Sequence, residues 1–169
     1  MEVVLHAAKK LEQQKDIRIY LIGDGPVKQD LVALQQKLAL TNVEFIPNQP
    51  SEKIIEWLAK CDAYIVPLKR IELFQGAIPS KLFEPLAVAK PILLGVEGEA
   101  KELFIDEGKG GLFFEPENAE ALADAIKILY NDRKLCIQLG ANGKDYVTNY
   151  FTRDKIATSF WNLLQEHYK

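Results

Sequence analysis

Short apolar runs alternate with longer amphipathic segments along most of this chain, in an order that predicts parallel strands joined by helices. The strands contain few polar positions, as is typical of strands covered on both faces. They are expected at residues 17–22, 43–46, 63–68, 91–95 and 112–114. Helices are expected over residues 2–11, 27–40, 51–60, 80–89 and 99–107, followed by three more over 118–131, 134–149 and 152–168.

This order predicts an α/β fold, a doubly wound parallel sheet of the Rossmann type with extra C-terminal helices. The 169 residues suit a single domain, residues 1–169. The first helix begins directly after Met1 with no strand before it, which is expected of a piece of a longer protein. Ligands of such folds bind at the carboxyl ends of the strands, so the expected ligand loops are 23–26, 47–51, 68–81 and 95–99.

Composition and charge exclude several classes of protein. Apolar residues make up 48% of the chain and charged residues 27%, as in an ordinary globular protein. The net charge of −3 and the lack of a basic stripe argue against a nucleic-acid partner. With no signal peptide and no apolar run long enough to span a membrane, a cytoplasmic location is expected. Two cysteines without metal-type spacing and two histidines predict free thiols and no metal site.

The stretch from Gly76 to Leu94 carries the clearest candidate chemistry. Pro79 and Ser80 are helix-start residues, and the start of a helix presents unpaired N–H groups that suit a phosphate. Lys81 adds a cation there, and Glu84 follows one turn later. Such a set would suit a nucleoside diphosphate, with the carboxylate on the ribose hydroxyls. An ordinary capped helix remains the alternative reading of these residues.

Other motifs are absent or have a simpler interpretation. The Gly23-Asp24-Gly25 turn is not a dinucleotide-binding fingerprint, because Lys28 stands where the third glycine would be. Neither a P-loop nor a nucleophile elbow occurs in the chain. The large aromatic residues, Trp161 among them, are expected to pack in the core.

Taken in order, several segments resemble the C-terminal, nucleotide-sugar-binding domain of a GT-B glycosyltransferase of family 4. The matching segments are residues 21–26, 43–47, 61–67, 79–84, 90–93, 98–99, 110–112 and 122–126, which together cover essentially the whole chain. Within that family, the form of residues 79–84 is similar to bacterial enzymes that build O-antigen, capsule and related surface polysaccharides.

The resemblance implies a donor-binding site for a nucleoside diphosphate sugar, with UDP as the expected nucleotide. It implies that the diphosphate lies near Ser80 and Lys81, that Lys81 stabilises the leaving group, and that Glu84 binds the ribose. The base would lie against the backbone of Pro47 and Asn48. The expected substrate-binding set is Gly23, Gly25, Pro47, Asn48, Gly76, Ile78, Ser80, Lys81 and Glu84. Neither a cofactor nor a metal is expected, because the helix amides and Lys81 would balance the charge.

The sequence also departs from the family's pattern. Gly76 stands where the first of two paired glutamates is usual, which puts the usual contact to the sugar hydroxyls in doubt. The family's first strand of this domain and the acceptor-binding N-terminal domain would precede Met1. We therefore expect a fragment of a retaining glycosyltransferase that is inactive alone, whose parent could associate with the cytoplasmic face of the inner membrane. A non-catalytic nucleotide-sugar-binding module and a UDP-sugar epimerase of the same fold remain alternatives, although two histidines count against the epimerase.

Overall fold

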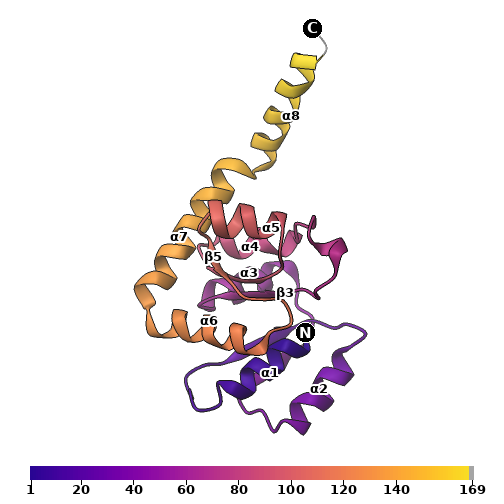
Figure 1. Cartoon of the computed structure of the whole chain (residues 1–169), viewed down its shortest axis with the longest axis vertical. Coiled ribbons are helices and arrows are strands. Elements are labelled where there is room, and N and C mark those ends of the chain that lie inside the picture. Colours follow the sequence, from indigo (N-terminus) through magenta and orange to yellow (C-terminus); the bar gives the residue numbers. More distant parts are fainter. Residues whose placement is uncertain (168–169) are drawn as a thin grey trace.

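The computed structural model describes residues 1–167 and shows an α/β fold built from parallel strands and helices, as the sequence predicts (Figure 1). The strands are β1 (Ile19–Ile22), β2 (Val43–Ile46), β3 (Tyr64–Pro67), β4 (Ile92–Gly95) and β5 (Gly111–Phe113). The helices are α1 (Glu2–Lys10), α2 (Lys28–Lys37), α3 (Ser51–Lys60), α4 (Phe83–Ala87), α5 (Glu99–Lys101), α6 (Ala119–Asn131), α7 (Arg133–Tyr150) and α8 (Arg153–His167).

The strands form two parallel sheets, where the sequence pattern predicts one. Strand β1 pairs with β2, with Ile19 opposite Val43, and β4 pairs with β3 on one side and β5 on the other. No ladder of backbone hydrogen bonds joins β1 to β3 within residues 1–167. The two sheets are held together by side chains, because both contribute to one apolar cluster that includes Ile19 and Leu93.

Helices cover both faces of the larger sheet. Along β4, Leu93 packs into a cluster with residues of α1 and α6, whereas Ile92 and Leu94 pack into a second cluster with residues of α4 and α7. All four β4 residues are buried, because successive side chains point to opposite faces and each face is covered. The doubly wound arrangement therefore holds for this sheet.

Several helices differ from their expected bounds. Helix α2 is shorter than 27–40, whereas α3 has the expected bounds, with Pro50 at its cap position and no capping side chain. The expected helix over 99–107 is α5 followed by a π-helical turn, Glu102–Glu107. Helices α6 and α7 each begin with a side-chain cap, since Asn118 accepts a hydrogen bond from the Ala121 amide and Asp132 accepts one from the Leu135 amide.

Helix α8 projects away from the rest of the molecule, continuing from α7 (Figure 1). None of its residues is buried, and Trp161 is 60% exposed, so the expectation that Trp161 packs in the core is wrong. The residues on which the core rests are instead aliphatic, together with Phe104 and Phe114. The expected helix over 152–168 reaches residue 168, which lies outside the described residues. Within residues 1–167, no helix has the length and apolar character needed to cross a bilayer.

Candidate functional site

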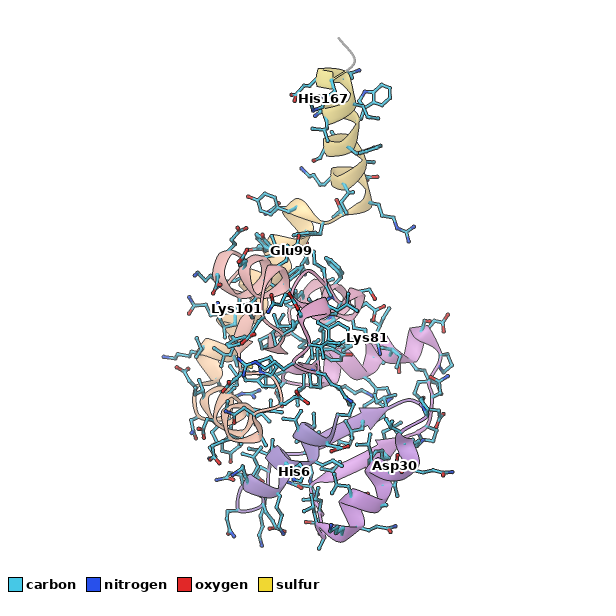
Figure 2. All side chains as sticks on the ribbon, turned by 45° about the vertical axis from the view of Figure 1, so that its right-hand side comes forward. His6, Asp30, Lys81, Glu99, Lys101 and His167 are labelled. Carbon is cyan, nitrogen blue, oxygen red and sulfur yellow. The ribbon has the colours of Figure 1, made fainter. Side chains whose placement is uncertain are left out.

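The predicted site residues all lie in segments that leave the carboxyl ends of strands. Gly23 and Gly25 follow β1, and Pro47 and Asn48 follow β2. The long connection after β3, residues 68–79, contains Gly76 and Ile78 and leads to Ser80 and Lys81. Figure 2 shows Lys81 between Asp30 on α2 and Glu99 on α5.

Asp24 joins the loops that follow β1 and β2. One oxygen of its carboxylate pairs with the Lys28 ammonium at the start of α2, and the other accepts a hydrogen bond from the Asn48 amide at 3.1 Å. The bond from Lys28 and then the bond from Asn48 lower the pKa of Asp24. The structure therefore brings Gly23, Gly25, Pro47 and Asn48 together, but the Asn48 amide already has a partner.

The segment expected to bind phosphate begins with a 3-10 turn, Ser80–Leu82, and continues as the five-residue helix α4. The expected Ser80 cap is not formed: Pro79 occupies the cap position, and no side chain accepts from the turn. The Leu82 amide donates to Pro79 and the Phe83 amide to Ser80, so the amides of Ser80 and Lys81 are the first two of the turn. The prediction of one long helix over 80–89 is thus wrong in its detail, because the turn is tight and α4 is short.

The side chains of Lys81 and Glu84 are exposed, and neither has an ion pair or a side-chain hydrogen bond in the described part of the chain. Phe83, between them, contacts Phe104 edge to face and also packs on Phe151. Pro85 is the third residue of α4 and is buried. A buried aromatic support thus holds a segment whose charged groups remain accessible.

Arg70 joins the loops that follow β3, β4 and β5. Its guanidinium donates to Glu97 at 3.0 Å and to Glu115 at 2.9 Å, and its backbone amide donates to Glu117 at 3.0 Å. The charge of Glu97 and the hydrogen bond to Glu115 raise the pKa of Arg70. Hydrogen bonds from Asn118 and then Arg70 lower the pKa of Glu115. Below, we call Arg70, Glu97, Glu115 and Glu117 the arginine clasp.

A second contact holds the connection after β3 against the loop after β4. The Glu99 amide donates to the Gln75 carbonyl at 2.9 Å, and a Cβ atom at Gly98 would overlap that carbonyl oxygen. Gly98 has φ +78° and ψ −144°, a conformation that residues with a side chain rarely adopt. The glycine therefore permits the close approach of Gln75, the neighbour of Gly76.

A cavity of about 320 Å³ lies beside the arginine clasp. Its walls come from the connection after β3 and from the loops after β4 and β5, and the lining residues are Lys69, Arg70, Ile71, Glu72, Phe74, Gln75, Val96, Glu97 and Pro116. Among the described residues, no group of three or more His, Cys, Asp and Glu side chains is placed to hold a metal ion.

Sequence reasoning missed Asp24, Arg70 and the role of Gly98. The sequence places Asp24 and Arg70 in the expected ligand loops, so the carboxyl-end rule could have marked them as candidates. Nothing in the sequence names their partners, because Arg70 meets carboxylates 27 and 45 residues away along the chain.

Comparison with known proteins shows the family and the fold. The family model described as "Glycosyl transferases group 1" matches residues 1–146. An uncharacterized glycosyltransferase of Methanocaldococcus jannaschii is 27% identical over 86% of this chain and 39% of its own length. An exopolysaccharide phosphotransferase of Streptomyces coelicolor is 32% identical over 94% of this chain and 16% of its own length. The chain thus spans well under half of either relative.

Solved structures share this fold over nearly the whole chain. A glycosyltransferase from Rickettsia africae superposes with a TM-score of 0.80 at 23% identity, covering 99% of this chain and 44% of that one. Anabaena HepE in complex with UDP-glucose gives a TM-score of 0.80 at 19% identity, covering 98% of this chain and 45% of that one. These likenesses confirm that the chain has the fold of GT-B glycosyltransferases.

Proposed function

Because the chain belongs to the family of group 1 glycosyl transferases, we propose that it binds the nucleoside diphosphate sugar donor of a retaining hexosyltransferase. The match of the family model to residues 1–146 carries this proposal. The positions of the loops support it, since every predicted site residue follows the carboxyl end of a strand or begins α4. HepE, which has the same fold, was crystallised with UDP and with UDP-glucose, so we propose UDP as the nucleotide.

In this proposal the diphosphate lies against the first amides of the 3-10 turn and the Lys81 ammonium. Both would stabilise the negative charge that grows on the diphosphate as the sugar–phosphate bond breaks. Glu84 would accept hydrogen bonds from the ribose hydroxyls, and the loops joined by Asp24 would hold the base. No metal ion is required if Lys81 and the amides balance the charge, so we expect binding to be unaffected by a chelator.

The names of several relatives support a role of the parent enzyme in the synthesis of surface polysaccharides. They include O-antigen chain mannosyltransferase C of Escherichia coli, 21% identical over 94% of this chain, and a lipopolysaccharide core glycosyltransferase of Rhizobium meliloti. We propose that the parent enzyme transfers its sugar during the synthesis of such a polysaccharide, at the cytoplasmic side of the membrane.

We also propose that a longer parent protein supplies a strand between β1 and β3 and a second, acceptor-binding domain. In β1 the amides of Ile19 and Gly23 donate to β2 and its flanks, so the amide of Tyr20 points to the other edge. In β3 the amides of Tyr64 and Leu68 donate to the β4 side in the same way. Each sheet thus has a free edge that one parallel strand would complete. Stronger amide-exchange protection of Tyr20 in a longer protein than in this chain would support the strand.

Ligand-observed NMR with UDP, GDP, ADP and their nucleosides tests the donor site. We expect the chain to bind UDP. Lys81→Ala should weaken binding because it removes the contact to the diphosphate, and Glu84→Ala should weaken it because it removes the contact to the ribose. Lys37→Ala and Glu56→Ala change exposed residues of the same types on α2 and α3 and serve as controls. Preference for GDP or ADP would correct the nucleotide, and equal loss in the control variants would refute the placement of the site.

We also expect the isolated chain to transfer no sugar, so turnover that scales with its concentration would contradict the proposed need for a second domain.

A further inference from the structure

We propose that Arg70 is a positioning residue that holds the connection between β3 and Ser80 in its binding geometry without touching the donor. This inference rests on the proposed function, because it concerns the segment that carries Gly76, Ile78 and Lys81. Among the described residues, Arg70 is the side chain that links the loops after β3, β4 and β5.

Much of the connection between β3 and Ser80 is weakly packed. Phe74 and Ile78 pack against the apolar cluster beneath α4, but Ile71 and Leu73 are exposed, and the 320 Å³ cavity separates part of the segment from the loops after β4 and β5. Side chains that line a cavity lose the dispersion contacts of a close-packed interior. Polar contacts at defined points must therefore fix the position of the segment.

Polar contacts hold this connection at two points. The arginine clasp holds residue 70, near the start of the connection, and the Glu99 amide holds Gln75 near its middle. Both contacts reach the loop that follows β4, since Glu97 and Glu99 flank Gly98. Gln75 is followed directly by Gly76, and Ser80 lies four residues after Gly76. A shift at either contact would thus pass along a short segment to the proposed phosphate site.

The charge of Arg70 is paired with carboxylates of the protein itself. The guanidinium of Arg70 has two carboxylate partners, and its backbone amide has a third. Its planar fork matches two acceptors, which an ammonium group would not do equally well. With Nη1 donating to Glu115 and Nη2 donating to Glu97, Arg70 serves the protein's own loops, which separates its role from that of Lys81.

Amide hydrogen exchange and UDP titration of the 169-residue chain test the inference. We expect Arg70→Gln to speed exchange of residues 69–79 and of the Glu99 amide, while the melting temperature stays close to that of the wild type. If the correctly placed population falls to about one fifth, the apparent affinity for UDP falls about fivefold. Arg133→Gln is the matched control, because it breaks an exposed arginine–aspartate pair with Asp62, 2.6 Å long, at the opposite ends of the strands.

The double variant Glu97→Gln/Glu115→Gln separates positioning from a direct charge effect. Positioning predicts that it loosens the loop and weakens UDP binding as Arg70→Gln does. A direct attraction between Arg70 and the diphosphate predicts the opposite, since removing two carboxylates would strengthen binding. Unchanged exchange of residues 69–79 in Arg70→Gln, or tighter binding by the double variant, would overturn the inference. A wild-type chain that binds no nucleotide would instead refute the proposed function, and the exchange data would still decide whether Arg70 orders the loop.

Discussion

Replacing Gly98 by alanine tests the contact between the two loops that border the candidate site. Gly98 has φ +78° and ψ −144°, close to a region that is populated almost only by glycine, so alanine there costs about 1–3 kcal/mol of backbone strain. The added Cβ would also overlap the Gln75 carbonyl oxygen, and moving Gln75 away breaks its hydrogen bond with Glu99, a further cost of about 1 kcal/mol. We therefore expect Gly98→Ala to lower the free energy of unfolding by roughly 2–4 kcal/mol.

Thermal and urea unfolding of the variant measure this loss. For a domain of this size, 3 kcal/mol corresponds to a melting temperature lower by roughly 6–12 °C. Gly76→Ala is the matched control, because Gly76 directly follows Gln75 and has nothing within 4 Å of an added Cβ and no positive φ. The reasoning is refuted if Gly98→Ala unfolds at the wild-type temperature, or if Gly76→Ala is destabilised as strongly.

Three further predictions concern the support of the site. Phe104→Ala removes a side chain that is 1% exposed and contacts Phe83, so we expect the free energy of unfolding in urea to fall by about 3–5 kcal/mol; a loss below 1 kcal/mol would contradict its central place in the cluster. Burial and the hydrogen bond to Glu107 raise the pKa of Tyr146 to about 12, so a tyrosinate absorbance step near pH 12 should vanish in Tyr146→Phe. The pKa of Glu115 is lowered in the folded chain, so its contribution to stability is present above the usual glutamate range and lost as the pH falls below it. Glu115→Gln should therefore be less stable than the wild type at pH 7, and urea titrations should show the difference shrinking as the pH falls below the usual glutamate range.

The strands and most helices could be predicted from the sequence because their signals are local. Period and composition place β4 within one residue, since a buried strand needs a continuous apolar run. The expected Ser80 cap was wrong for a local reason as well: Ser80 follows Pro79, which takes the cap position itself. The split into two sheets could not be predicted, because strand order depends on contacts between distant segments.

The candidate site, too, could be predicted from local signals but not in its contacts between distant segments. The carboxyl-end rule located the loops that carry Gly23, Asn48 and Lys81, because it depends only on the order of strands and helices. The hydrogen-bond partners of Asp24 and Arg70 could not be predicted from the sequence, since these bonds join loops that meet only after folding. Trp161 was misjudged because apolar residues on an amphipathic helix predict a covered face, whereas α8 projects from the molecule.

The division into two sheets has a mechanical consequence. Side-chain packing joins the sheet that carries the Asp24 loops to the sheet that carries Lys81, and packing resists sliding far less than a ladder of directional bonds would. The boundary between the two sheets therefore deforms more easily than a continuous sheet would, and the candidate loops lie on both sides of this boundary. A ligand that contacts loops of both sheets would restrain their motion relative to each other. Its binding free energy would then include the cost of this loss of motion, so tighter binding and a more rigid molecule would be measured together.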